Sequence, residues 1–252
     1  MDPLSDKLFS ARLSGLLSQS ERNGCAVFSP FLDERQCAEA EAWCRRNAGG
    51  MCYTLYGGYD GARRKMLAFY PDYCQDFIMD EFPMVCLTFT FRKEDKLTHR
   101  DFLGSFMALR LKREVIGDII TDEGNAQAFV TEIAAKDIMS SVSKIGRIGV
   151  RITDEQPFVL EHEQEFKEIG GTVASMRLDC IVGLAANISR SNAADLIRGE
   201  KVDINHFTVT SVSHELKEGD ILSIRGCGRF ILSGIDGLTR KGRIHINLRK
   251  YV

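Results

Sequence analysis

RLDCIVGLAANISRSNAADLIRGEKVDIN, residues 177–205, decides the fold of the carboxyl-terminal part of this 252-residue chain. Asp179 and Ser189 are residue types that often stand at helix starts, and apolar residues follow each of them at helical spacing. These apolar positions are Leu178, Ile181, Val182 and Leu184 in the first segment and Ala193, Ala194 and Ile197 in the second. The pattern predicts two short helices that pack together.

Cationic residues cluster at the ends of these two predicted helices. Charged side chains are costly to bury without partners, so most of these cations should emerge at the surface, where they could contact phosphates. A merely solvated rim of charge is the alternative for any single arginine. The residues that we expect to contact RNA are Arg177, Asp179, Ser189, Arg190, Ser191, Arg198, Lys201, Asn205, Arg225 and Arg229.

A family pattern runs through residues 177–230. It consists of RLDxxV, then SRxxA, then IRGxxVxIN, followed by LKEGDILSIRGCGRF (216–230). This pattern resembles the small RNA-binding domain named after the fourth small-subunit ribosomal protein, called here the S-four domain. One departure is His206, which stands where the turn of that domain usually carries glycine. Because asparagine tolerates positive φ, we expect the turn to persist at Asn205 with a changed geometry.

Charge is segregated along the chain. The formal net charge is −2, but residues 172–252 hold 12 Lys and Arg against 8 Asp and Glu, a net +4, and residues 1–171 carry −6. Binding to a polyanion depends on the local field, so a basic carboxyl-terminal region can bind RNA while the whole chain is acidic.

The composition indicates the cellular compartment in which the protein works and the kinds of site that it holds. The chain lacks an apolar run of the roughly 18 residues that a membrane helix needs, and its start lacks the features of a signal peptide, so we expect a cytoplasmic protein without a membrane partner. None of the eight cysteines forms a CxxC pair. We therefore expect free thiols, no metal and no cofactor.

The fold class expected for the chain is α+β, in four segments. Residues 1–80 form an amino-terminal α/β segment of helices and a β-hairpin, with Asp33 and Gln36 as a capping box. Residues 81–155 form a ferredoxin-like plait, residues 156–171 an acidic linker, and residues 172–252 the S-four-type domain. In the hairpin, strands 51–56 and 64–71 flank the glycine-rich turn 57–62; no Lys-Ser or Lys-Thr follows it, which disfavours a nucleotide-binding loop.

The plait is predicted from its order of elements, β-α-β-β-α-β, which RNA-recognition domains share. The expected ranges are strand 84–91, helix 98–113, strands 117–122 and 126–131, helix 132–145 and strand 147–152. Alternation in the first strand directs Phe89 toward the helices and Thr88 outward. Phe129 alone holds an aromatic position of the RNA-recognition motif, so base stacking on this sheet stays a minor alternative.

Further cations form a secondary set of expected RNA contacts, against the alternative of solvated faces. Some flank the glycine-rich turn, some lie at the two ends of helix 98–113, and some lie on the outer row of the final strand, 243–251. They are Arg63, Arg64, His99, Arg100, Arg110, Lys112, Arg113, Arg243 and Arg249.

Three segments together resemble the YlmH-type RNA-binding proteins: LYGGYDGARRKMLAFYPDY (55–73), LTHRDFLGSFMALRLKREVIGDIITDEGNAQAFV (97–130) and the S-four string. The resemblance implies a bacterial cytoplasmic protein on the large ribosomal subunit. It implies that the carboxyl-terminal domain grips 23S rRNA and that the preceding segments face peptidyl-tRNA on stalled subunits, in ribosome-associated quality control. Relatives of similar layout in photosynthetic bacteria are a second branch to which the chain could belong.

Two other functions compete with this non-catalytic one. S-four domains are also attached to pseudouridine synthases and methyltransferases, so an RNA-modifying enzyme is the alternative. Against it, the only RLD segment belongs to the S-four string and the GxGxxG loop of a dinucleotide or methyl-donor site is absent. A regulator that binds transcripts away from ribosomes is the third hypothesis. We expect no enzyme activity and no small-molecule substrate.

Overall fold

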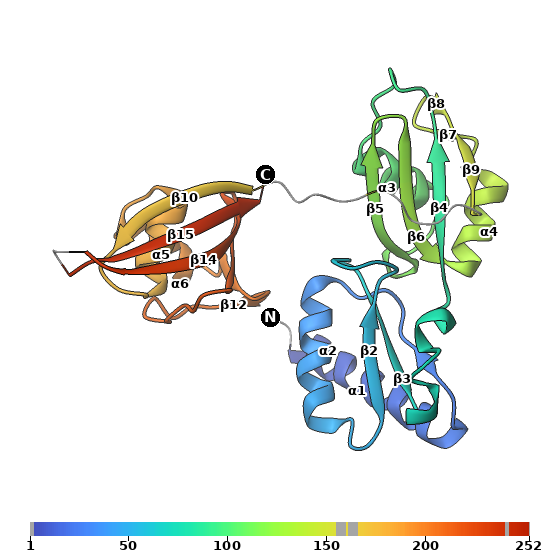
Figure 1. Ribbon diagram of the computed structural model, residues 1–252, viewed down its shortest axis with the longest axis horizontal. Helices are drawn as coiled ribbons and strands as arrows, with labels where there is room; N and C mark the ends of the chain where they lie inside the picture. The colour runs from blue at the N-terminus through green and yellow to red at the C-terminus, as the bar shows by residue number, and fades with distance from the viewer. Residues whose placement is uncertain (1–2, 155–159, 161–165, 240–241, 252) are drawn as a thin grey trace. The chain divides into compact units, whose positions relative to one another are not determined.

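The computed structural model describes residues 3–154, 160, 166–239 and 242–251 (Figure 1). The chain divides into two compact units, residues 1–162 and 163–252. Each unit combines helices with antiparallel sheet, which confirms the α+β class. Among the described helices, none has both the length and the apolar content needed to cross a membrane.

The first unit begins with two helices and a three-stranded sheet. Asp33 and Gln36 form the predicted capping box at the start of the second helix, with Gln36 N donating to Asp33 Oδ1 over 2.8 Å. The strands lie in the order β1-β3-β2, and a core around Leu67 and Phe69 joins them to the helices. The elements are α1 (Pro3–Asn23), β1 (Val27–Phe28), α2 (Glu34–Asn47), β2 (Cys52–Tyr56), β3 (Met66–Tyr70) and two 3-10 turns, η1 (Asp72–Cys74) and η2 (Ile78–Glu81).

The second half of this unit is the plait. Its antiparallel sheet has the order β5-β6-β4-β9, and α3 and α4 pack against one face through Phe89, Phe102 and Phe106. This order, with both helices on one face, is that of the predicted β-α-β-β-α-β plait. The elements are β4 (Met84–Thr90), α3 (His99–Ala108), η3 (Arg113–Val115), β5 (Ile116–Asp122), β6 (Asn125–Thr131), α4 (Glu132–Ser141), β7 (Lys144–Ile145), β8 (Ile148–Gly149) and β9 (Arg151–Thr153).

The opposite face of the plait sheet is covered. Phe129 is 3% exposed and packs in a core with residues of β3 and of the η2 region. Thr88 was expected to face outward, but it is buried and accepts a hydrogen bond from Gln127 Nε2, whose Oε1 in turn accepts from the backbone N–H of Leu160. Because Phe129 is buried, it cannot act as a base-stacking platform, and that alternative is wrong.

Two predicted helices of the plait are shorter than expected. The helix predicted over 98–113 ends at Ala108, and Arg110 has a left-handed φ of 61°, so the basic residues after it do not share a helix face with His99. The helix predicted over 132–145 ends at Ser141, and the short β7–β8 hairpin follows it.

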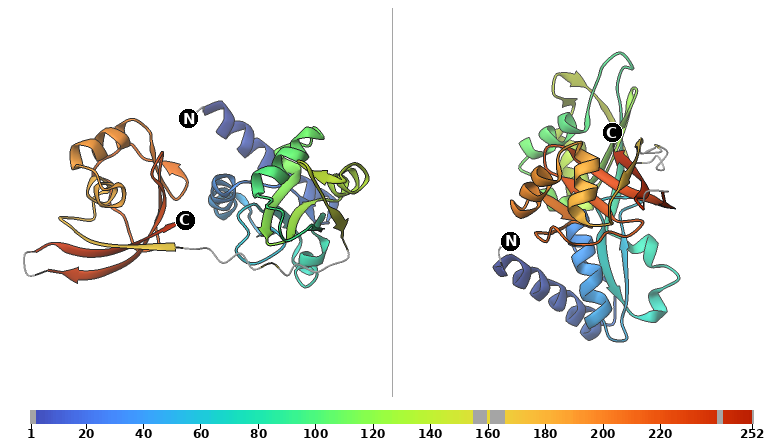
Figure 2. Two further views of the ribbon diagram at one scale, coloured as in Figure 1. Left: turned by 90° about the horizontal axis from the view of Figure 1, so that it is seen from above. Right: turned by 90° about the vertical axis from the view of Figure 1, so that its left-hand side faces the viewer.

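The second unit is a six-stranded antiparallel sheet with two helices on one of its faces (Figures 1 and 2). The strand order is β10-β15-β14-β13-β11-β12. Ile181 and Ile197 of the two helices pack on Leu222, Phe230 and Leu248 of the sheet. The elements are β10 (Phe166–Val173), α5 (Leu178–Ala186), α6 (Arg190–Arg198), β11 (Val202–Ile204), β12 (Phe207–Thr208), β13 (Ile221–Ile224), β14 (Gly228–Leu238) and β15 (Ile244–Tyr251).

Part of the expected acidic linker lies in this sheet. Residues 156–159 and 161–165 lie outside the described residues, whereas the end of the expected linker belongs to β10, which pairs along its length with β15. Gly170 and Gly171, the last two residues of the expected linker, are therefore strand residues. Glycine suits Gly171, because a Cβ there would come within 2.4 Å of Leu184 on α5.

Candidate RNA-binding site

Helices α5 and α6 form the predicted packed pair. Ser189 caps α6 as expected, since its hydroxyl accepts a hydrogen bond from Asn192 N over 3.2 Å. The cap residue of α5 is Arg177 rather than Asp179, which lies inside the first turn. Asn187, with a φ of 52°, ends α5 and allows the chain to turn directly into α6. The two helix starts are thereby held close together.

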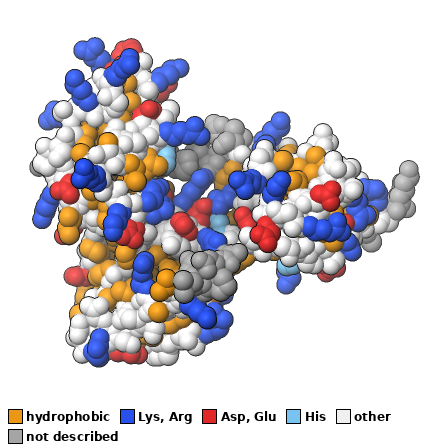
Figure 3. Space-filling view, turned by 180° about the vertical axis from the view of Figure 1, so that it is seen from behind, with side chains coloured by type: hydrophobic (Ala, Val, Ile, Leu, Met, Phe, Trp, Pro, Cys, Tyr) orange, Lys and Arg blue, Asp and Glu red, His pale blue; other side chains and the backbone are white. Residues whose placement is uncertain are grey.

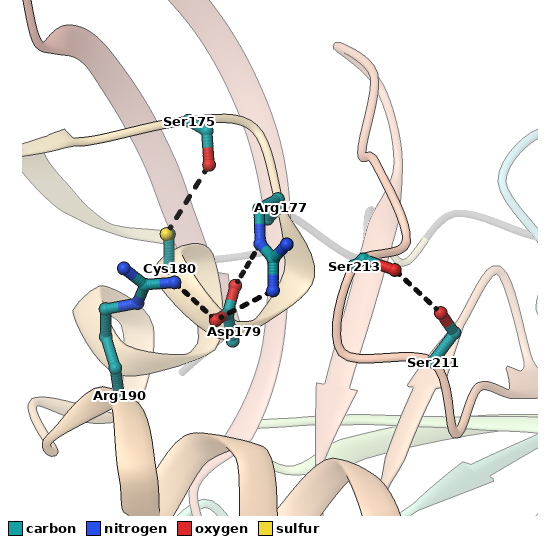
Figure 4. A network of polar contacts seen from close by, with 7 residues as sticks. All are labelled: Ser175, Arg177, Asp179, Cys180, Arg190, Ser211 and Ser213. Atoms are coloured by element: carbon teal, nitrogen blue, oxygen red, sulfur yellow. Dashed lines mark hydrogen bonds and ion pairs between the residues drawn. The ribbon is translucent and has the colours of Figure 1, made fainter.

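An ion cluster joins these two helix starts and is called here the Asp179 cluster: Arg177, Asp179 and Arg190 (Figure 4). Asp179 Oδ1 accepts from Arg177 Nε over 3.1 Å, and Asp179 Oδ2 accepts from Arg190 Nη2 over 2.6 Å. The Asp179 side chain is only 8% exposed, whereas that of Arg190 is 58% exposed. The carboxylate thus lies beneath two guanidinium groups that reach the surface, and the cluster carries a net positive charge.

This geometry sets the pKa of Asp179. Burial by itself raises the pKa, but the hydrogen bonds and charges of Arg177 and Arg190 outweigh burial and lower it to about 2. Asp179 is therefore ionised throughout the physiological pH range. An ionised carboxylate repels phosphate, so we expect Asp179 to orient Arg177 and Arg190 and not to make the RNA contact predicted from the sequence.

We expect Asp179→Asn to weaken RNA binding about tenfold, although it raises the net charge by one. Without the carboxylate, the two guanidinium groups lose their fixed orientation and repel each other. The same change should cost on the order of 2 kcal/mol of the second unit's stability, because the pKa of Asp179 is depressed in the folded state. In the native chain this contribution is complete above about pH 4 and is lost as the pH falls toward about 2. Fluorescence anisotropy with labelled RNA and calorimetric unfolding measure the two effects.

Asp195→Asn is the matched control. Asp195 lies on α6, is 72% exposed and approaches Arg198 only to 3.7 Å, so its replacement adds the same charge without removing a buried partner. We expect unchanged or slightly tighter RNA binding. Tighter binding by both variants would mean that Asp179 acts only as an unfavourable charge.

A second group of cations lies where α6 ends and the sheet begins: Arg198, Lys201 and Arg225, called here the α6 end group. The backbone N–H of Arg225 donates to the Lys201 carbonyl over 2.9 Å, which fixes β13 beside β11. All three side chains are exposed. Among the described residues, no carboxylate lies within 4.0 Å of the Lys201 ammonium or the Arg225 guanidinium. The negative end of the α6 dipole favours cations here.

The remaining predicted contacts of this unit have different surroundings. Asn205 forms a two-residue turn with His206, at φ values of 48° and 72°, which confirms that the turn persists. The Asn205 amide donates to Asp220 and accepts from Ile221 N, so it braces the sheet. Arg229 contacts His206 and lies over the Tyr251 ring. Ser191 is exposed in the first turn of α6.

The outer row of β15 is engaged with other parts of its own sheet. Arg243 Nη2 donates to the Thr172 carbonyl over 2.7 Å, and the Arg249 guanidinium lies 5.1 Å from the centre of the Phe166 ring. His245 contacts Asp236 over 2.9 Å. These interactions make the row less suited to phosphates than the α6 end group is.

Two of the secondary cations in the first unit point inward. Arg64 donates to the carbonyl oxygens of Phe31, Arg113 and Ile116, and Arg113 donates to Ile116 and Gly117. Burial lowers the pKa of Arg113 to about 10, and the nearby charge of Arg64 adds to this. Arg64 therefore ties the hairpin segment to the plait, whereas Arg113 makes local hydrogen bonds at the start of β5. The secondary cations that the structure leaves at the surface are Arg63, His99, Arg100, Arg110 and Lys112.

Sequence reasoning missed Asp118 on β5. Its Oδ2 accepts from Tyr59 Oη over 2.9 Å and from Arg63 N over 2.6 Å, and its Oδ1 accepts from Arg64 N over 3.1 Å. One carboxylate thus holds the glycine-rich turn on the plait. The sequence feature that could have indicated Asp118 is its position in the middle of the apolar strand IGDIIT, because an acidic residue in such a strand usually has a specific partner.

Comparisons with known proteins identify the family to which this chain is similar. Residues 79–158, which contain the plait, match a family model described as a "putative RNA-binding domain in YlmH". The ribosome-associated protein quality control protein P2 of Bacillus subtilis (strain 168) is 30% identical over 224 residues, which are 87% of this chain and 85% of the relative.

A solved structure shares the fold. The cell division protein ylmH from Streptococcus pneumoniae superposes with a TM-score of 0.53 and 19% identity, over 62% of this chain and 94% of the other. At that identity, the likeness bears on architecture alone.

Proposed function

This chain belongs to the YlmH family, and on that premise we propose that it is a non-catalytic RNA-binding protein that works on the large ribosomal subunit in the cytoplasm. Its expected ligands are 23S rRNA and the peptidyl-tRNA of stalled subunits, as in ribosome-associated quality control. The observation that carries the proposal is the α5–α6 pair, with the Asp179 cluster at one end and the α6 end group at the other.

The two ends of α6 give this surface its shape. Arg190 is the first residue of the helix and Arg198 the last, so their Cα positions are about 12 Å apart along an axis that rises about 1.5 Å per residue. Cations held at fixed separation on packed helices suit the phosphates of folded RNA, which proteins recognise largely by shape. We therefore propose that the second unit is an S-four domain in function as well as in sequence pattern.

The first unit supplies a further RNA contact in this proposal. The region that matches the RNA-binding family model contains the plait, and the exposed cation Arg100 lies in the first turn of α3, next to His99. Figure 3 shows one face of the molecule, on which Lys and Arg side chains are interspersed with Asp and Glu over both units. Binding in the first unit is thus expected at local sites and not over a uniformly basic face.

Sedimentation of ribosomal subunits through a sucrose gradient tests the function. We expect the protein to migrate with the 50S particle, and we expect the double variant Lys201→Ala, Arg225→Ala to move at least in part to the top fractions. Removal of these two exposed cations should lower affinity about tenfold or more at moderate salt.

The matched control removes two exposed arginines of α2, Arg45→Ala and Arg46→Ala, and should leave sedimentation unchanged. Residence of the native protein in the top fractions alone would contradict the proposal. Equal loss in both double variants would show that overall charge, and not the α6 end group, sets the association.

A further inference from the structure

The first unit contains a small polar cavity where the glycine-rich turn meets the plait. It has a volume of about 280 Å³. Tyr59 comes from the turn, Arg63 directly follows it, and His99 comes from the start of α3. The remaining lining residues lie on β5: Asp118, Ile119, Ile120 and Thr121. We propose that this cavity binds one extruded nucleotide of an RNA, with its base against Tyr59; the inference rests on the proposed RNA-binding function and deepens it.

The walls of the cavity are fixed before any ligand arrives. The Asp118 carboxylate holds Tyr59 Oη and the backbone N–H groups of Arg63 and Arg64. Behind Tyr59, the Phe129 ring lies nearly parallel to it, with centroids 5.5 Å apart and an interplanar angle of 20°. A preformed aromatic wall avoids the entropic cost of ordering a side chain on binding.

The chemistry of the lining matches the parts of a nucleotide. Tyr59 offers a ring for base stacking, which proteins use to bind unpaired bases. Arg63 is exposed at the cavity and supplies a positive charge for a phosphate. Asp118 offers an acceptor for a base amino group, as carboxylates do for the cytosine amine. Ile119 and Ile120 give the apolar part of the wall.

His99 adds a neutral polar group to this lining. Partial burial lowers its pKa, the charges of Arg113 and Arg63 lower it further, and Asp118 opposes them. The imidazole is therefore uncharged near neutral pH, with one nitrogen as donor and the other as acceptor. Such a group suits the edge of a base or a ribose hydroxyl.

The size of the cavity favours a single nucleotide. Its volume of about 280 Å³ lies just below the roughly 300–1,000 Å³ of sites for drug-sized ligands. Bases within an A-form helix are stacked and paired, so only a bulged, looped or terminal nucleotide can enter. The RNA recognised here must therefore have an unpaired position.

Two labelled RNA hairpins, identical except for one bulged nucleotide, test the inference by fluorescence anisotropy with the full chain. We expect the bulged hairpin to bind about 10- to 100-fold more tightly, the range produced by one base–aromatic stack. Tyr59→Leu should remove this preference and leave affinity for the fully paired hairpin unchanged. Tyr59→Phe, which keeps the ring and loses the hydroxyl, should retain most of the preference.

Two further measurements test whether the nucleotide binds in this cavity and whether it belongs to an RNA or is free in solution. Arg63→Ala should reduce the preference several-fold, whereas Arg147→Ala, which removes an exposed cation elsewhere in the first unit, should not. Free mononucleotides should compete only at millimolar concentrations. Micromolar competition without a preference for the bulged hairpin would overturn the inference in favour of a free-nucleotide site.

The outcomes separate this inference from the proposed function. Equal affinity of the native chain for both hairpins, or a preference that survives Tyr59→Leu, would refute the cavity as a nucleotide site while RNA binding stands. Failure to bind either hairpin would refute both.

Discussion

Raising the salt concentration from 50 to 200 mM should weaken binding of structured RNA by about 150- to 500-fold. The expected contacts are about four or five phosphates, because the Asp179 cluster and the α6 end group together hold five cations. Each neutralised phosphate releases condensed counterions, and the slope of log affinity against log salt is about −0.9 per contact for a duplex. An interface dominated by such contacts must therefore be steeply dependent on salt.

A titration by filter binding or anisotropy at four or more salt concentrations gives this slope. Lys201→Ala should make the slope shallower by about one, because one phosphate contact is lost. Arg45→Ala, on the exposed surface of α2, should leave the slope as it is. A nearly flat native slope would contradict the proposed mode of binding, since it would mean that apolar or neutral polar contacts dominate.

Replacing Gly58 by alanine should destabilise the first unit by about 2–4 kcal/mol. Gly58 has a φ of 99°, which strains an L residue, and a Cβ there would lie 2.1 Å from Cε1 of the Phe129 ring. Phe129 is buried between the turn and the plait, so it cannot move aside without opening a core. The cost combines backbone strain with overpacking.

Urea unfolding followed by Trp43 fluorescence measures this effect selectively. Trp43 is the only tryptophan of the chain and packs on Phe69 in the first unit, so the signal reports that unit. The control is Gly61→Ala in the same turn, where φ is 86° but no atom lies within 4 Å of the added Cβ. We expect Gly61→Ala to cost about 1 kcal/mol from strain alone. Equal losses in both variants would show that contact with Phe129 does not limit this position.

Local sequence patterns were sufficient to predict most elements of the fold. The capping box of Asp33 and Gln36, the alternation of β15 and the apolar faces of α5 and α6 all correspond to features of the structure. Each depends on residues a few positions apart, because helix and strand periodicity act over that range. The ends of elements were predicted less well: α3 stops at Ala108, and Arg110, with a left-handed φ of 61°, turns the chain away from the helix.

Candidate binding residues were harder to predict than elements. The sequence identified a set of arginines, but it could not separate Arg190, which reaches the surface, from Arg64, which caps buried carbonyls. Both are arginines next to polar segments. What distinguishes them is the environment that tertiary packing provides, and this includes Asp118, which lies 54 residues from Arg64 in the sequence.

The sequence by itself determined the type and order of the elements, the segregation of charge and the family pattern at the carboxyl end, because these depend on composition and short spacings. Only the tertiary structure decided the partner of each charged side chain: Asp179 beneath two arginines, and Asp118 across the glycine-rich turn. The physical reason is that a charge is cheap to expose and costly to bury alone, so its role is set by the groups that distant segments bring to it.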